Sequence, residues 1–331
     1  MIDFDRFKKR FLQFGGWRLV FQYARMGVLW TGCVALLRCI IRGKSLKQAY
    51  PTITKKVDKI LVTRYKYILN DYKKNVLLGN YHNIKTSCVP KIVWFSWLQG
   101  IETAPILVKV CLESQKLHLH DYEFRILDFN NYHQWVQLPQ YVVDKYRKGI
   151  IPSASFSDLI RLAVLKKYGG IWMDATVYCS GFGNDNLKKR WEKIMHSELT
   201  IFRYFKQGIN EPIGLSTWFF SVVPHNIIIS VALDMLLAYW KDFNCLIDYY
   251  IIHLFLELTL SEFPDVVSNM PHENSSYSLF LANVLRNDYK EKDWINMTKY
   301  VSIHKLNYRK VEEAMKNPHS YCSYIINKID I

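Results

Sequence analysis

Residues 153–180 constrain the fold of this chain more than any other stretch. The segment opens with serines, continues with apolar residues at helical spacing, breaks at Gly169-Gly170 and ends a short apolar run at Asp174. This pattern predicts a helix over 153–168, a tight turn, and a buried strand over 171–173. A carboxylate at the tip of such a strand is how α/β enzymes present a polar group to a ligand crevice.

The segments on either side predict an α/β domain. From residue 89 onward, short β-rich runs alternate with helical stretches, a pattern typical of a Rossmann-like, mostly parallel sheet flanked by helices. Strands are expected over 91–97, 122–127, 171–173 and 218–223. Helices are expected over 104–118, 153–168, 227–240, 246–260 and 275–288, with helix or loop over 131–149 and a short helix near the end of the chain.

The positive charge is concentrated at the start of the chain. The formal net charge is +15, and residues 1–75 carry 17 Lys/Arg against 4 Asp, which leaves +13 of it there. These basic residues are interleaved with large apolar ones, for example over 4–14, where phenylalanines recur at helical spacing. That mixture fits an anionic membrane surface better than nucleic acid. We expect a basic amphipathic helical region over 1–75 and a catalytic domain over 76–331. Whether the helical region contacts a membrane, packs on the catalytic domain or does both stays open.

No segment predicts a membrane span or a cleavable leader. The apolar run Val28–Leu37 has about half of the roughly 20 residues that a spanning helix needs. Arg18 and Arg25 interrupt the apolar stretch that a signal peptide would require. Seven scattered cysteines without a CxxC pair indicate reduced thiols. The sequence therefore predicts a cytoplasmic protein held at the inner face of the cell membrane.

Four side chains of the 153–180 segment are candidates for chemistry. Asp158 and Arg161 are three positions apart and share a helix face. Such a pair is often only a structural ion pair, but its place directly before the glycines and Asp174 favours a site. Asp174 can bind a divalent cation or accept hydrogen bonds from sugar hydroxyls; alternatively, it simply opens a turn. Thr176 adds a hydroxyl group two residues later.

The motifs together resemble a known family. Lys-Ile-Val-Trp-Phe-Ser-Trp-Leu-Gln-Gly over 91–100, Ser-Asp-Leu-Ile-Arg over 157–161 and Tyr-Gly-Gly-Ile-Trp-Met-Asp-Ala-Thr over 168–176 resemble the capsular polysaccharide synthesis glycosyltransferases. These are similar to glycosyltransferase family 32 and to other DXD-containing sugar transferases. The resemblance covers about residues 89–310. It implies a GT-A fold, a nucleotide-sugar donor and retention of the anomeric configuration.

The resemblance also implies roles for individual residues. Asp158 and Arg161 would grip the donor sugar, and Asp174 would be the first aspartate of the DXD triplet. The second aspartate is replaced by Thr176, so one carboxylate ligand for a Mn²⁺ or Mg²⁺ cofactor is missing. The donor would also be bound by residues of the first strand and of the helix start: Phe95, Ser96 and Trp97 near the nucleotide base, and Ser155.

The tail Ser-Ile-His-Lys-Leu-Asn-Tyr-Arg-Lys over 302–310 resembles the terminal segment of the same group. His304 would bind the metal together with Asp174, with its imidazole in place of the lost carboxylate. A lone histidine is more often a core or surface residue, so that alternative stays open. Lys305 would neutralise the leaving diphosphate. Asp248 and His253 are weaker candidates for an acceptor pocket, and core packing is the favoured interpretation for both.

These expectations combine into one hypothesis. The chain would transfer a sugar from a nucleoside diphosphate to a lipid-linked oligosaccharide in capsule synthesis, with no nucleic-acid partner. One alternative is a non-catalytic sugar- or lipid-binding scaffold, which the missing second aspartate leaves open. Another is a glycosidase, which needs two carboxylates about 5–9 Å apart.

Overall fold

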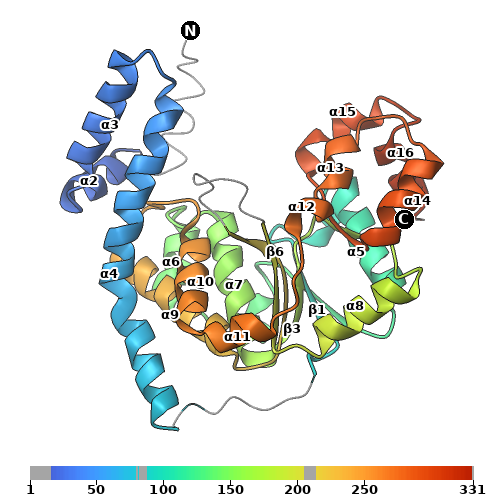
Figure 1. The fold of residues 1–331 in the computed structure, drawn as a ribbon, viewed down its shortest axis with the longest axis horizontal. Helices are drawn as coiled ribbons and strands as arrows, with labels where there is room; N and C mark the ends of the chain where they lie inside the picture. Colours follow the sequence, from blue (N-terminus) through green and yellow to red (C-terminus); the bar gives the residue numbers. More distant parts are fainter. Residues whose placement is uncertain (1–15, 80, 82–87, 205–213, 330–331) are drawn as a thin grey trace.

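A five-stranded sheet stands at the centre of the computed structural model, with helices on both sides (Figure 1). The structure describes residues 16–79, 81, 88–204 and 214–329. The strands are β1 (Ile92–Ser96), β2 (Glu123–Leu127), β3 (Gly170–Met173), β4 (Val177–Cys179), β5 (Leu199–Arg203), β6 (Leu215–Val222) and β7 (Ile303–Lys305). The amphipathic helix expected over 4–14 lies outside the described residues.

Fifteen α-helices accompany these strands in the described part of the chain. The first six in order are α2 (Trp17–Arg25), α3 (Leu29–Ile41), α4 (Tyr50–Leu77), α5 (Ile106–His118), α6 (Gln140–Arg147) and α7 (Ser153–Tyr168). The middle ones are α8 (Asp185–Met195), α9 (Ile227–Asp242), α10 (Ile251–Glu262) and α11 (Pro264–Asn269). The last are α12 (Ser275–Ser278), α13 (Phe280–Val284), α14 (Glu291–Tyr300), α15 (Val311–Met315) and α16 (Tyr321–Asn327).

The strand order of the central sheet is β2-β1-β3-β6-β5. β1 pairs in parallel with both β2 and β3, whereas β6 is antiparallel to β3 and to β5. Four strands therefore run in one direction and β6 alone runs in the other. This confirms the predicted α/β class with a mostly parallel sheet flanked by helices.

A second, two-stranded sheet joins β4 to β7 in antiparallel register, with Val177 opposite Lys305 and Tyr178 opposite His304. Neither strand was predicted as such. The pairing brings the C-terminal part of the chain to the segment that directly follows β3.

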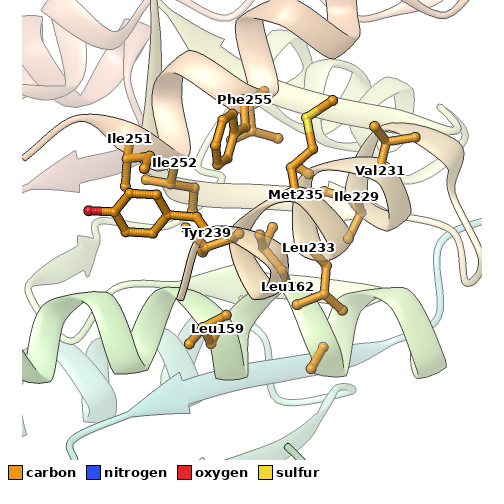
Figure 2. Packing of buried hydrophobic residues seen from close by; sticks show 14 of the residues in the cluster. Leu159, Leu162, Ile229, Val231, Leu233, Met235, Tyr239, Ile251, Ile252 and Phe255 are labelled. Atoms are coloured by element: carbon orange, nitrogen blue, oxygen red, sulfur yellow. The ribbon is translucent and has the colours of Figure 1, made fainter. Parts of the chain in front are cut away.

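The main hydrophobic core lies where α7, α9 and α10 pack together (Figure 2). Leu159 and Leu162 of α7 face apolar side chains of the other two helices, among them Tyr239 and Phe255. All four are fully buried. This packing fixes α7 along one side, and α7 carries both Asp158 and Arg161.

Helix α4 packs on the same core. Its buried residues Val57, Leu61, Tyr65 and Leu69 belong to the main cluster, and Lys73 forms an ion pair with Glu262 at 2.6 Å. Helices α2 and α3 lie at the N-terminal end of α4 (Figure 1). Among the described residues no single helix is long and apolar enough to cross a membrane, although α2 and α3 together, bent by 110°, meet the same criteria of length and composition.

Most of the expected elements are confirmed, and α7 has the predicted bounds. The prediction of one helix over 275–288 is wrong. Two short helices, α12 and α13, meet there at Leu279, whose N–H bonds to the Ser276 carbonyl three residues back. Such a bond tightens the turn and interrupts the α-helical pattern. Helix α10 begins later than predicted, after a turn in which the Asp248 carboxylate accepts the Tyr250 N–H.

The glycine pair between α7 and β3 is required by the backbone. Gly169 and Gly170 have φ of 64° and 97°, a region that favours glycine. A Cβ at Gly169 would also lie 2.7 Å from the Val222 carbonyl and from the Pro224 ring. Val222 is the last residue of β6 and Pro224 follows it closely, so a shift of either would disturb the end of that strand.

Replacing Gly169 by Ala should lower the free energy of unfolding by about 3 kcal/mol, because backbone strain and a steric clash add together. Gly149→Ala is the matched control, since Gly149 has φ of 66° but no atom within 4 Å of the place that a Cβ would take. Its loss should be about 1 kcal/mol, from strain alone. Denaturant unfolding of both variants measures the difference, and equal losses would contradict the clash.

Candidate functional site

Asp174 stands at the carboxyl edge of the central sheet, where ligands of α/β proteins bind. It directly follows β3, and its N–H donates to the Trp218 carbonyl at 2.9 Å. Trp94 of β1 pairs with Trp172 of β3, so the end of β1, at Ser96, reaches the same edge. The predicted position of Asp174 at a strand end is confirmed.

Arg161 links the two aspartates. Its Nη1 donates to Asp158 Oδ1 at 2.9 Å, and its Nη2 donates to Asp174 Oδ1 at 2.8 Å. The guanidinium carbon lies 4.8 Å from the centre of the Trp172 ring, and the Trp172 indole N–H donates to Asp174 Oδ1 at 3.0 Å. Two distinct nitrogens bond to two carboxylates, so the three charged groups hold one another in a fixed arrangement.

Lys305 completes this cluster from a distant part of the chain. Its Nζ lies 3.7 Å from Asp174 Oδ2 and donates to the Thr176 hydroxyl at 2.5 Å. The β4–β7 pairing supplies this geometry, together with a bond from the Leu306 N–H to the Thr176 carbonyl at 2.8 Å. The structure therefore brings together five predicted residues, named here the acidic–basic cluster: Asp158, Arg161, Asp174, Thr176 and Lys305.

The two carboxyl groups of the cluster differ in pKa. Burial raises the pKa of Asp158 to about 6, and the charge of Asp174 adds to this, while Arg161 opposes it. Burial also acts on Asp174, but the positive charges of Arg161 and Lys305 and the Trp172 bond outweigh it and lower its pKa. Asp174 is thus held ionised at neutral pH, and Asp158 titrates close to it.

Three polar atoms next to the cluster are buried without a hydrogen-bond partner among the described residues: Ser96 Oγ, Trp97 Nε1 and Arg161 Nε. Buried polar groups are normally hydrogen-bonded, so orphaned atoms at a sheet edge indicate a place for a polar ligand. Ser96 and Trp97 were predicted at the donor, and they lie where the parallel strands end.

The other two predicted donor residues have different surroundings. Phe95 is fully buried in a small apolar cluster with Ala104, Val108 and Leu112, so its ring supports the strand and does not face an open site. Ser155 is buried in the first turn of α7, three residues before Asp158.

His304 is not brought to Asp174. It is fully buried, its Nε2 lies 3.0 Å from the Ser180 hydroxyl, and its ring faces Tyr178. Successive side chains of a strand point to opposite faces, so Lys305 at the cluster places His304 on the other side of β7. Burial lowers the pKa of its imidazole to about 4.

The cluster as it stands does not fit a bound Mn²⁺ or Mg²⁺. Among the described residues no group of three His, Cys, Asp or Glu is arranged to hold a metal ion. Asp174 Oδ1 accepts from Arg161 and Trp172, and Lys305 lies beside Oδ2. A cation at Asp174 would therefore meet a lysine ammonium group where a second carboxylate ligand is normally found.

His253 of α10 lies near the cluster, although the sequence pattern favoured core packing for it. Burial, and then the charge of Arg161, lower the pKa of its imidazole to about 4, and Asp174 acts in the opposite direction. Its Nδ1 is buried without a partner among the described residues. The sequence named His253 only as a weak candidate for an acceptor pocket, because its position beside the cluster depends on how α10 packs.

A cavity of about 950 Å³ lies elsewhere in the described part of the chain. It is lined by residues of α12, α13, α14 and α16, among them Tyr277, Phe280 and Tyr300. None of the cluster residues lines it. The site at Asp174 is therefore identified by its charges and unpaired polar atoms.

Comparisons with known proteins place the chain in a family. No curated protein sequence matches it. Among solved structures, one titled "PaToxG Glycosyltransferase" is similar, with 15% identity and a TM-score of 0.39 over 82% of this chain and 95% of that chain. A likeness at this level carries no functional argument. The model of the family described as "Capsular polysaccharide synthesis protein" matches residues 46–325, which include the whole acidic–basic cluster. The chain therefore belongs to the capsular polysaccharide synthesis protein family.

Proposed function

We propose that this protein is a glycosyltransferase that moves a sugar from a nucleoside diphosphate to a glycan acceptor during capsule synthesis. Its family membership supports a transferase role. The observation that carries the proposal is the Arg161-bridged pair of aspartates beside Lys305, at the carboxyl edge of the sheet. The topology of that sheet is compatible with a GT-A fold.

Each part of the cluster has a role in binding the donor. Asp158 and Asp174 have carboxylate oxygens that accept hydrogen bonds from sugar or ribose hydroxyls, which fixes the orientation of the sugar. The Ser96 hydroxyl and the Trp97 indole N–H, at the end of β1, are buried without a partner among the described residues, and in this proposal they bond to a polar edge of the nucleotide. Arg161 is bound to both aspartates and therefore holds them in place before the donor arrives.

The reaction itself needs positive charge next to the diphosphate. The bond from the sugar's anomeric carbon to the diphosphate oxygen breaks, a bond to the acceptor oxygen forms, and the acceptor's proton passes to the leaving diphosphate. Negative charge grows on that diphosphate in the transition state. Lys305 stabilises this negative charge, and Arg161, which is bonded to Asp174, adds a second positive charge nearby. In this proposal attack occurs on the face that the diphosphate leaves, so configuration is retained.

The mechanism includes no step through a metal, because the groups around Asp174 do not offer a cation its ligands. A Mn²⁺ or Mg²⁺ cofactor stays a prediction from the sequence. The acceptor in this proposal is a lipid-linked oligosaccharide at the inner face of the cell membrane.

A glycosidase is less compatible with the same geometry. A glycosidase needs two carboxylates that flank the scissile bond of a sugar. Here Asp158 and Asp174 bond to one buried guanidinium group, which holds them side by side. A non-catalytic scaffold is distinguished from a transferase by whether any donor is turned over.

Incubation with a panel of UDP-, GDP- and CDP-sugars should release free nucleotide from at least one donor. Asp174→Asn should lower kcat/KM for that donor by about 10²–10³, because a fixed charge of the site is removed. Asp185→Asn is the matched control, since Asp185 lies exposed in α8, and it should keep the wild-type rate. No turnover with any donor, in the presence of membranes that supply acceptor, would indicate a scaffold.

The rate should also depend on the ionisation of Asp158. Its pKa is raised to about 6, so the carboxylate that orients the sugar is lost as pH falls through 6. We expect kcat/KM for the donor to rise between about pH 5 and 7. Asp158→Asn should be slower and lack this limb of the profile. A profile that is flat in the wild type, or identical in the variant, would contradict the role of Asp158.

Removal of divalent cations distinguishes Lys305 from a metal as the source of positive charge. With EDTA the rate should stay within about twofold, whereas Lys305→Met should lower kcat by about 10²–10³. Lys299→Met, at an exposed position of α14, is the control. A rate that falls with EDTA and returns with Mn²⁺ would contradict this mechanism and support the metal predicted from the sequence.

A further inference from the structure

Helices α2 and α3 expose an unusual amount of apolar surface. Eight of the twenty large hydrophobic side chains that are exposed in the described residues lie between 17 and 41. The most exposed are Trp17 at 79%, Trp30 at 78% and Ile41 at 75%. Contiguous exposed apolar patches on a soluble surface mark an interaction site.

The exposed side chains share defined faces. Trp17 and Phe21 are four residues apart in α2, and Trp30, Leu37 and Ile41 are seven and four apart in α3, spacings that align side chains along a helix. These five residues are named here the exposed apolar face.

The opposite sides of these two helices pack against the rest of the protein. Val28, between α2 and α3, is fully buried in the main core, and Ala35 and Cys39 of α3 are buried as well. The Tyr23 hydroxyl donates to the Ile247 carbonyl at 3.1 Å. The helix pair is therefore anchored on the body of the protein and presents the exposed apolar face outward.

The charge around this face indicates its partner. Residues 17–57 contain eight Lys/Arg and no Asp or Glu. The exposed ones next to the apolar face are Arg18, Arg25, Arg38, Arg42 and Lys44. Exposed tryptophans beside basic side chains match the layered structure of a lipid surface, with acyl chains below anionic headgroups.

The dimensions favour insertion into one leaflet. The longer helix, α3, has 13 residues and spans about 20 Å, less than the roughly 30 Å of a hydrocarbon core. The break at 26–28, with Gly27 at φ 66°, turns α3 by 110° relative to α2. A bent pair with helices this short matches an element that lies in the interface plane.

We infer that α2 and α3 form a membrane-docking element that inserts the exposed apolar face into the surface of an anionic bilayer. This narrows the membrane contact expected for residues 1–75 to one bent helix pair and one face. It does not depend on the catalytic assignment.

The same end of the molecule carries the acidic–basic cluster. At the C-terminal end of α4, the Tyr72 hydroxyl donates to Asp234 at 2.6 Å, and the Tyr81 hydroxyl beyond it bonds to the His225 carbonyl, close to where β3 begins. Near the N-terminal end of α4, the charges of Asp248 and Glu257 act on Asp58. The Glu257 carboxylate also accepts the Gly214 N–H directly before β6, and the start of β6 lies at the end of β3 that carries Asp174. The N-terminal end of α4, with α2 and α3, therefore lies toward that end of β3.

Flotation of the full-length protein with vesicles tests the element. Vesicles of phosphatidylcholine with phosphatidylglycerol should bind the wild type, and vesicles of phosphatidylcholine alone should bind it less. Trp30→Glu with Ile41→Glu should lower the bound-to-free ratio on anionic vesicles by about tenfold or more. Both side chains are exposed, so the melting temperature should match the wild type.

The matched control changes the net charge equally at other exposed apolar positions. Leu117→Glu with Ile295→Glu, at side chains 58% and 55% exposed, should leave the ratio within about twofold. Equal binding by the Trp30/Ile41 variant, or an equal loss in the control, would overturn the inference.

Two further measurements separate lipid insertion from association between protein chains. Acyl chains brominated near the headgroup should quench tryptophan fluorescence in the wild type, and less in Trp17→Phe with Trp30→Phe; unchanged quenching would overturn insertion. Light scattering checks for a second copy of the chain as the partner. A dimer that the Trp30/Ile41 variant converts to a monomer, without vesicle binding by the wild type, would replace the lipid surface by a protein interface.

Discussion

The buried guanidinium of Arg161 is the interaction on which the site depends. Its side chain is only 6% exposed, and a charge that deep in a protein must be paired and hydrogen-bonded. It has two carboxylates, one from its own helix and one from the following strand. The pairing requires that α7 and β3 lie close together and that the chain reverses direction between them. The Gly169-Gly170 turn makes this reversal possible. A constraint of folding thereby becomes a fixed pattern of charge, which is what catalysis by electrostatic preorganisation needs.

The cluster is completed by a residue far away in sequence. Lys305 and Thr176 are 129 positions apart, and a pairing of only three residues, between β4 and β7, brings them together. This pairing rests on a separate apolar cluster in which Tyr178 and Leu306 pack against α5, α13, α14 and α16. The C-terminal helices therefore have a function in the site without contributing a side chain to it: they hold the strand that carries the lysine.

Part of the site is formed by neighbouring segments and part by segments far apart in the chain. This difference explains what could be predicted from the sequence. Helix α7, β1, and the pairing of Asp158 with Arg161 depend on spacing within one segment, and local spacing predicts them. The β4–β7 pair depends on a contact between distant, three-residue strands that have no pattern of their own. Because β7 was not predicted as a strand, we expected both His304 and Lys305 at the donor. Neighbouring side chains of a strand face opposite sides, so only one of them reaches the cluster. His253 was only a weak candidate for an acceptor pocket, because its position near the cluster follows from the packing of α10.

Helix α4 relates the site to the surface on which the proposed acceptor would be presented. Its 28 residues span about 42 Å, and it packs along its length on α9 and α10 as part of the main core. An ion pair between Arg64 and Asp242 and another between Lys73 and Glu262 add specificity to this packing. A helix held in this way cannot swing relative to the sheet without breaking the core. The distance from α2 and α3 to Asp174 is therefore set by the fold, and in the proposed arrangement a lipid-linked acceptor would meet the donor at one fixed height above the bilayer.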